Sequence, residues 1–363
     1  MTSLFSPIAL RGLTVKNRIW VSPMCQYSVE RRDGVPTDWH FVHLGSRALG
    51  GFGLIMTEAT AVTADGRISP QDTGLYNSEQ VEAWRRIVDF VRGQDAHMGV
   101  QLAHAGRKSS TFAPWLGKNS VPADQGGWQA VAPSAIAFGD YAEPRALTIS
   151  EIDDIVAAFG QSTRLALQAG IDLVEIHAAH GYLPHQFLSP LANQRTDEYG
   201  GSFENRVRFL LRVVAEVRDS LPEDFPLVVR ISGTDWVEGG WTIQDSTELA
   251  QLLAARGVDL IDVSSGGLHP AQKITVGPGY QVPFARDVRT KADIPTGAVG
   301  LITEPAQAQA ILDEGSADVV LLARAALREP AWPLRAAHEL GIPAADAPYP
   351  EQYTRAVWRR STT

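Results

Sequence analysis

Cysteine is almost absent from this sequence of 363 residues, in which Cys25 is the single thiol. One thiol excludes an internal disulfide and any cluster of cysteine ligands for zinc or an iron–sulfur centre. Long apolar runs are missing as well. No stretch approaches the ~20 apolar residues of a membrane span, and the first residues do not form the basic and apolar segments of a signal peptide. We therefore expect a cytoplasmic protein without a membrane anchor.

Basic residues are fewer than acidic ones. Lys and Arg together number 32 against 41 Asp and Glu, and the formal net charge at pH 7 is -9. Because the basic residues are dispersed and form no stripe, we expect no nucleic-acid partner. Hydrophobic residues make up 44% of the chain, enough to bury a large core in one α/β domain or in two smaller ones.

Short apolar runs rich in β-branched residues recur along the chain, with amphipathic stretches between them. This alternation is typical of repeated βα units around a parallel sheet. Several runs are apolar at successive positions, as expected of strands that are covered on both faces. The runs are residues 18–22, 53–57, 99–102, 173–176, 227–231, 260–263, 295–298 and 319–322. Eight strands predict a closed (β/α)8 TIM barrel, a single α/β domain over residues 1–340.

The helices between the runs carry recognisable ends. Ser150 and Asp153 resemble a capping box, which predicts a helix that continues to Ala169 and ends at Gly170. Residues 204–219 place apolar side chains at three- and four-residue spacing, which predicts a helix with one face against the core.

Two segments do not fit the repeat. Residues 103–147 are rich in Gly, Pro and Trp and show no periodicity, so we expect a long loop excursion that covers the carboxyl end of the third strand. Residues 341–363 begin with Pro and Ala and continue into an aromatic and cationic stretch. We expect this C-terminal tail to be held in place by a contact elsewhere, because a free terminus would fray.

Polar residues follow every predicted strand. A TIM barrel carries its functional groups on the loops at the carboxyl ends of its strands, so these residues are expected to meet at one rim. In chain order they are residues 22–27, 58–59, 101–108, 177–182, 230, 264–267, 298–300 and 323–324.

The last two of these loops lie where many barrels bind phosphate. Gly300 permits a close approach of the backbone, and Arg324 offers a charge-assisted hydrogen bond to an anion. A glycine after a strand is equally explained by simple turn chemistry, so both interpretations stay open.

His177 and His180 are separated by two residues just beyond the fourth strand, and both can turn toward one pocket. No third ligand of suitable spacing accompanies them, which disfavours a metal site. They are either structural histidines or a pair of donors to a carbonyl or nitro oxygen that becomes negative during reaction. In the second case Tyr182 is placed to supply a proton.

Gln101 and Arg230 are polar residues at strand ends, where a buried polar group needs a partner. The pyrimidine edge of a flavin offers one. The alternative for Arg230 is an internal ion pair with Glu58 or Asp262. From the sequence pattern alone, we expect Cys25 to be a small buried apolar residue.

Five segments together resemble the Old Yellow Enzyme family of FMN-dependent ene-reductases, in particular its thermophilic-like bacterial branch. The resemblance covers almost the whole chain. The segments are KNRIWVSPMCQYS, DWHFVHLGSRALGGFGLIMTEATAV, QLAHAGRK, EIHAAHGYLPHQFLSPLANQRTDEYGGSFENRVRFLLRVVAEVR and VVRIS.

The resemblance implies tightly but non-covalently bound FMN and assigns the residues of its site. His177 and His180 are implied to hold the activating oxygen of the substrate, Tyr182 to donate a proton, and Tyr27 to line the substrate pocket. Cys25 is implied to lie near flavin N5, which takes precedence over its bland interpretation. The implied FMN contacts are Ser22, Pro23, Met24, Cys25, Ala59, Gln101, Arg230, Gly300, Ala323 and Arg324.

The resemblance also concerns the tail. Arg355 is similar to an arginine that this branch inserts into the site of a neighbouring subunit, and Trp358 would shape the same pocket, which implies a homodimer or homotetramer. The chain departs from the family in two places. Ala323-Arg324 stands where Gly-Arg is usual, and Arg355-Ala356-Val357-Trp358 replaces the commoner Arg-Gly-Trp.

The implied activity is an NAD(P)H-dependent reduction of the activated C=C bond of α,β-unsaturated carbonyls, imides or nitroalkenes by a ping-pong hydride transfer. Two alternatives remain from the residues alone. One is a phosphate-handling barrel aldolase or isomerase, which would be colourless. The other is a non-catalytic flavin or redox sensor that uses Cys25.

Overall fold

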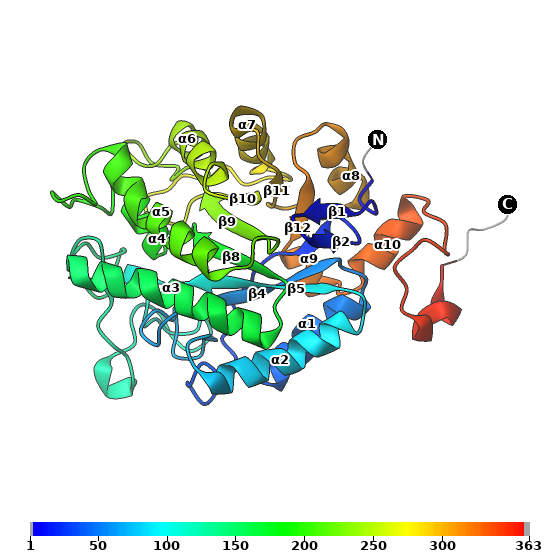
Figure 1. Cartoon of the computed structure of the whole chain (residues 1–363), viewed down its shortest axis with the longest axis horizontal. Coiled ribbons are helices and arrows are strands. Elements are labelled where there is room, and N and C mark those ends of the chain that lie inside the picture. The colour runs from blue at the N-terminus through cyan, green and yellow to red at the C-terminus, as the bar shows by residue number, and fades with distance from the viewer. Residues whose placement is uncertain (1–2, 359–363) are drawn as a thin grey trace.

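The computed structural model describes residues 3–358, and its centre is a closed barrel of eight parallel strands (Figure 1). Each barrel strand overlaps one of the runs predicted from the sequence, so the (β/α)8 TIM barrel is confirmed. The strands follow one another around the barrel in chain order. They are β3 (Ile19–Val21), β4 (Leu54–Ala61), β5 (His97–Ala103), β8 (Leu173–Ala178), β9 (Leu227–Ser232), β10 (Leu260–Ser264), β11 (Thr296–Ala298) and β12 (Val319–Leu322).

Helices form the outer layer of the molecule (Figure 1). α5 (Phe203–Ser220) shows why they lie there: Val207, Leu210, Val214 and Val217 recur at helical spacing and are all buried, as the sequence predicts. The others are α1 (Asp38–Leu49), α2 (Ser78–Arg92), α3 (Ile149–Ala169), α4 (Leu183–Leu188), α6 (Ile243–Ala254), α7 (Val282–Ala292), α8 (Pro305–Asp313), α9 (Arg324–Arg328) and α10 (Trp332–Glu339).

The start of α3 corrects one prediction. Its N-cap is Thr148, whose hydroxyl accepts from the Glu151 amide while Glu151 Oε2 accepts from the Thr148 amide at 2.8 Å. The predicted capping box of Ser150 and Asp153 is therefore wrong by two residues. Thr148-x-x-Glu151 fits the pattern better, because Glu reaches back to the N-cap amide. The predicted end is confirmed, since Gly170 adopts φ +81°.

The inside of the barrel changes character along the strands. Near their amino ends the inward residues are apolar and form one buried cluster. A hairpin of β1 (Ile8–Leu10) and β2 (Leu13–Val15) packs onto this cluster and closes that end. Because strand residues alternate between two faces, the next inward positions carry the polar layer of the barrel. Its members are Gln101, Glu175, His177, Arg230, Asp262 and Ser264, all buried.

The segment between β5 and α3 contains little regular structure. It holds two 3-10 turns, η1 (Gly106–Lys108) and η2 (Ala123–Gln125), and a two-residue ladder of β6 (Val131–Ala132) with β7 (Arg145–Ala146). Trp115, in this segment, packs its ring edge-on against Tyr27 with centroids 5.8 Å apart. The segment thus lies at the carboxyl end of the barrel.

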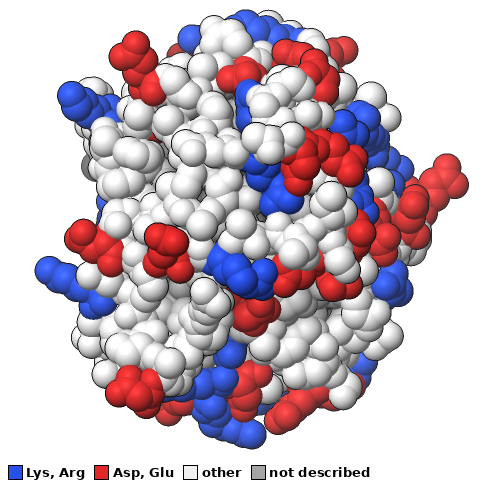
Figure 2. Space-filling model, turned by 90° about the vertical axis from the view of Figure 1, so that its left-hand side faces the viewer, with Lys and Arg blue, Asp and Glu red and all other residues white. Residues whose placement is uncertain are grey.

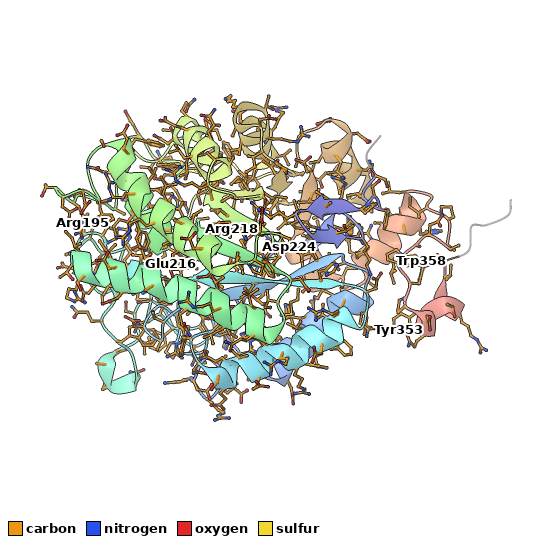
Figure 3. All side chains as sticks on the ribbon, viewed as in Figure 1. Arg195, Glu216, Arg218, Asp224, Tyr353 and Trp358 are labelled. Carbon is orange, nitrogen blue, oxygen red and sulfur yellow. The ribbon has the colours of Figure 1, made fainter. Side chains whose placement is uncertain are left out.

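The C-terminal tail lies at the other end. It contains η3 (Glu351–Ala356) and borders a cavity of about 640 Å³ together with Lys16 and Asp95, which precede barrel strands. Tyr353 and Trp358 are 45% and 47% exposed, and the ring of Trp358 lies 5.4 Å from that of His338 on α10 (Figure 3). None of the helices within residues 3–358 combines the length and apolarity needed to cross a membrane.

The apolar cluster predicts where stability resides. Leu260→Ala removes a fully buried side chain of this cluster and should lower the free energy of unfolding by about 2–5 kcal/mol. Leu116→Ala makes the same chemical change at a side chain that is 56% exposed, and should change it by less than about 0.5 kcal/mol. Urea unfolding followed by circular dichroism measures both, and equal effects would contradict this account of the core.

Candidate active site

Three residues from the end of β8 and the loop after it meet at the mouth of the barrel. The imidazole rings of His177 and His180 lie 5.1 Å apart between centroids, and Nδ1 of His180 is 3.4 Å from Nε2 of His177. The ring of Tyr182 lies 4.9 Å from that of His177. The turn that makes this possible is tight, because His180 has φ +57° and Gly181 has φ +73°. The predicted grouping of these three side chains is confirmed.

Their surroundings determine which groups carry protons. Burial, followed by the charge of Arg230, lowers the pKa of both His177 and His180 well below the ordinary value, so both imidazoles are neutral at pH 7. Nδ1 of His177 accepts from the Ala179 amide at 3.3 Å, which leaves the proton on Nε2. Burial raises the pKa of Tyr182, so its phenol keeps its proton. Nε2 of His180 lies 2.7 Å from Ser264 Oγ. The cluster therefore contains two neutral imidazoles and a protonated hydroxyl.

Beneath this cluster lies the polar layer of the barrel. Gln101 Nε2 donates to Glu175 Oε1 at 2.7 Å, and Arg230 Nε lies 3.0 Å from Asp262 Oδ2. The strand register places Asp262 directly opposite Arg230. Of the two acids considered as partners for Arg230, the structure thus selects Asp262. The terminal guanidinium nitrogens make no hydrogen bond within residues 3–358, so the ion pair leaves donors free for a ligand.

Burial, with the charge of Asp262 as the second cause, raises the pKa of Glu175 to about 8. Glu175 is therefore mostly protonated at pH 7. The layer then holds one neutral acid and one ion pair, which avoids two buried negative charges next to each other.

The loop after β3 brings Cys25 and Tyr27 to the same place. Both pack with Tyr182 against a small apolar cluster that includes Ala59. Gln26 anchors this loop, because its amide donates to Glu58 Oε2 at 2.9 Å, and Glu58 Oε1 lies 2.8 Å from His40 Nε2. Burial, followed by the nearby carboxyl groups of Asp72 and Glu58, raises the pKa of Cys25 well above its ordinary value. The thiol is uncharged at neutral pH.

Two loops form a cationic pocket of about 160 Å³ after β11 and β12. Arg324 and Arg328 contribute to its wall, and no Asp or Glu does. Gly300 adopts φ +124°, and a Cβ atom there would lie 2.9 Å from the side-chain amide of Gln281. Ala323 has φ -98°, so the methyl group that replaces the family's usual glycine is accommodated without a left-handed backbone. The pocket fits a phosphate group.

A second, outer pocket of about 420 Å³ opens beside Tyr27 and Tyr182. Its remaining wall comes from Ile68 and from the 103–147 excursion, which contributes Lys108, Phe112 and Tyr141 among others. Figure 2 looks onto this end of the barrel, where uncharged side chains form much of the surface and acidic and basic side chains are scattered among them. The predicted residues Arg355 and Trp358 do not join this site, because the tail lies at the opposite end of its own barrel.

Residues 3–342 match the profile of the NADH:flavin oxidoreductase / NADH oxidase family. The chain belongs to this family. Among similar proteins, it is 49% identical over 341 residues to an NADPH dehydrogenase of Geobacillus sp. (strain WCH70), covering 94% of this chain and 95% of that one. It is 48% identical to the NADPH dehydrogenase of Geobacillus thermodenitrificans (strain NG80-2), over 99% of both chains.

Solved structures of the same kind resemble this flavin oxidoreductase. Morphinone reductase in complex with tetrahydroNAD superposes with a TM-score of 0.78 at 29% identity, over 94% of this chain and 92% of that one. The old yellow enzyme homologue from Zymomonas mobilis gives a TM-score of 0.77 at 29% identity, over 94% and 93%. The protein is thus an oxidoreductase that uses FMN, with NAD(P)H as the hydride donor.

The residues present in this flavin oxidoreductase fit FMN. The hydroxyl of Ser22 is buried and makes no hydrogen bond within residues 3–358. The buried Arg230 faces Asp262 through Nε, and no hydrogen bond of its terminal nitrogens is found within the same residues. The cradle at Gly300 has space only for a residue without a side chain. A buried donor without a partner is costly, and the edge of a flavin ring removes that cost.

The sequence does not predict every side chain that surrounds the site. It assigns no role to Lys108, the last residue of QLAHAGRK, and it does not predict the buried pairs His40–Glu58 and His185–Asp235. The one signal in the sequence was position: Lys108 stands just beyond a barrel strand, where side chains face the rim. The histidines gave no such signal, because their partners come from distant parts of the chain.

Glu175 predicts a measurable pH dependence. Its pKa is 4.5 as an ordinary side chain and about 8 in the fold, so folding takes up a proton between these values and stability contributed by Glu175 falls as pH rises through that window. Glu175→Gln cannot titrate. The free energy of unfolding of this variant should therefore rise relative to wild type from pH 5 to pH 8, as measured by urea unfolding of the holoenzyme. Glu248→Gln, on the exposed side of α6, should give the wild-type pH dependence. A constant difference between Glu175→Gln and wild type would contradict the assignment.

Proposed function

We propose that this protein is an ene-reductase, which reduces the activated C=C bond of an α,β-unsaturated carbonyl, imide or nitroalkene in a ping-pong cycle. When bound, FMN accepts a hydride from NAD(P)H and later delivers it to the β-carbon of the substrate. The observation that carries the proposal is the cluster of His177, His180 and Tyr182: two neutral imidazoles and a protonated phenol beside an uncharged thiol.

The residues that hold FMN follow from the two sites described above. Gln101 and Arg230 would hold the flavin ring from the polar layer, and Gly300 and Arg324 would bind its phosphate in the cationic pocket. The ion pair with Asp262 fixes the orientation of the Arg230 guanidinium. The complete proposed set is Ser22, Pro23, Met24, Cys25, Ala59, Gln101, Arg230, Gly300, Ala323 and Arg324.

The side chains of the β8 loop act on the substrate. His177 and His180 donate hydrogen bonds to its oxygen, which becomes more negative as the β-carbon receives a hydride. Tyr182 then gives its phenolic proton to the α-carbon, and its raised pKa keeps that proton available at neutral pH. Tyr27 and the thiol of Cys25 close the pocket on the other side.

The related structures support the same class of reaction by name. Besides morphinone reductase, a 2-naphthoyl-CoA reductase complex superposes with a TM-score of 0.85 at 26% identity, over 93% of this chain and 52% of that one. The single free thiol is also compatible with work in the cytoplasm, where the sequence analysis places the protein.

A visible spectrum tests the proposal directly. The purified protein should be yellow, anaerobic NADPH should bleach it, and maleimide or cyclohexenone should restore the colour. A colourless protein would return the choice to a barrel aldolase or isomerase. Flavin that is retained but not reduced by NAD(P)H would favour a sensor.

Tyr182→Phe tests the proton donor. The variant lacks the hydroxyl but keeps the ring that packs on His177, so flavin reduction by NADPH should stay within about two-fold of wild type. Reoxidation by cyclohexenone should slow by roughly 100-fold or more, the usual contribution of a general acid. Stopped-flow absorbance separates the two half-reactions, and loss of the reductive one instead would reject this role.

We also propose that Arg355 and Trp358 complete the site of a neighbouring subunit in a homodimer or homotetramer. Support comes from the tail itself, which keeps these side chains exposed at the end of the barrel remote from its own site.

Arg355→Ala should raise the KM for cyclohexenone several-fold, by loss of one charged contact, while FMN content stays the same. Arg286→Ala, which removes an exposed arginine of α7, is the matched control and should leave the KM unchanged. Light scattering gives the mass in solution. A monomer with full activity would contradict the shared site.

A further inference from the structure

One lysine occupies an unusual position above the active site. Lys108 ends the 3-10 turn that follows β5, and its ammonium group donates to the main-chain carbonyl of His180 at 2.8 Å and to that of Gly267. It also lies 4.0 Å from the ring centroid of Phe138 and 5.7 Å from that of Tyr182. One cation on the 103–147 excursion therefore contacts both the loop after β8 and the loop after β10.

This cation has no acidic partner. Within residues 3–358, Lys108 makes no ion pair, and carbonyl oxygens and aromatic faces take the place of a carboxylate. Burial, followed by the charge of Arg107, lowers the pKa of Lys108 to about 7. A desolvated ammonium without a counter-ion attracts any negative charge that develops nearby more strongly than an exposed lysine does.

The backbone around Lys108 leaves little freedom. His180 has φ +57°, a left-handed conformation that a residue with a side chain rarely adopts. A Cβ on Gly181 would lie 2.3 Å from the Gly267 carbonyl oxygen, and one on Gly267 would lie 2.6 Å from the His180 Cα. The β8 and β10 loops thus touch through their backbones, and both present a carbonyl to the same ammonium. The amide of His180 is fixed as well, by Ser232 Oγ at 2.9 Å.

We propose that Lys108 is a positioning residue for proton transfer: its ammonium group clamps the loops that carry His180 and Tyr182, and stabilises the negative charge that Tyr182 acquires when it protonates the substrate. This inference rests on the proposed ene-reductase function. It adds Lys108 to the cluster of His177, His180 and Tyr182, in which Tyr182 alone had a role in proton transfer.

The charge balance of the step explains why a cation belongs there. The O–H bond of Tyr182 breaks, a C–H bond forms at the α-carbon, and the phenol becomes a phenolate until water returns a proton. Burial is the main cause that disfavours a negative Tyr182, and Cys25, Tyr27, Asp72 and Tyr141 add to it. The ammonium group of Lys108, 5.7 Å from the centroid of the Tyr182 ring, is the nearby positive charge that would favour the phenolate.

Replacing Lys108 by Met tests the inference, since Met has a similar length and no charge. Reoxidation of the reduced enzyme by cyclohexenone should slow by roughly ten-fold or more, while reduction by NADPH should change by less than about two-fold. Lys108→Arg keeps a cation and should recover most of the rate. Lys291→Met, on α7 and paired there with Asp287, is the control and should behave as wild type. Equal effects on both half-reactions would overturn the proposal.

A double-mutant cycle shows whether Lys108 acts through Tyr182. In a Tyr182→Phe background no phenolate forms. Adding Lys108→Met to this background should therefore slow reoxidation little further and should leave the solvent isotope effect on reoxidation unchanged. Additive losses would mean that Lys108 acts independently, and would overturn the proposal. Should Lys108→Met fail to fold, Lys108→Ala with added propylamine replaces it, and absence of rescue by the amine would count against the charge. If wild type itself is not reoxidised by cyclohexenone, the proposed function fails instead.

Discussion

The ion pair between Arg230 and Asp262 is the constraint on which the rest of this site depends. Both side chains are buried inside the barrel, next to the apolar cluster at the amino ends of the strands. An unpaired charge in such surroundings is very unfavourable. Burial is the main cause of the lowered pKa of His177 and His180 and of the raised pKa of Glu175; the charge of Arg230 adds to the first effect and that of Asp262 to the second. This cross-strand contact therefore reinforces the protonation states that burial sets.

Two further buried pairs support the loops around this centre in the same manner. His40 joins Glu58 behind the Cys25 loop, and His185 lies 2.9 Å from Asp235 behind the β8 loop. In each case a member of the pair also binds a main-chain amide of the loop: Glu58 accepts from Gln26, and His185 Nδ1 accepts from Gly181 at 2.9 Å. The reacting side chains are thus held by polar contacts that do not themselves reach the pocket.

The sequence predicts the barrel well because its strands are covered on both sides. A strand such as β12 has to be apolar at every position, and its carboxyl end has to carry the functional loop. The partner of Arg230 was not predictable, since Glu58 and Asp262 are equally suitable acids and strand register alone decides between them. Lys108 was missed for a related reason. Its acceptors are backbone carbonyls, and these are present at every residue and mark no position in a sequence.

The β1–β2 hairpin at the amino end of the barrel limits the access of small molecules to the polar layer. Ile8, Leu10 and Val15 seal that side with apolar side chains, so no small molecule reaches the polar layer from there. The outer pocket beside Tyr27 and Tyr182 opens at the opposite end of the barrel. In the proposed ene-reductase, two reactants that use this pocket would have to occupy it one after the other.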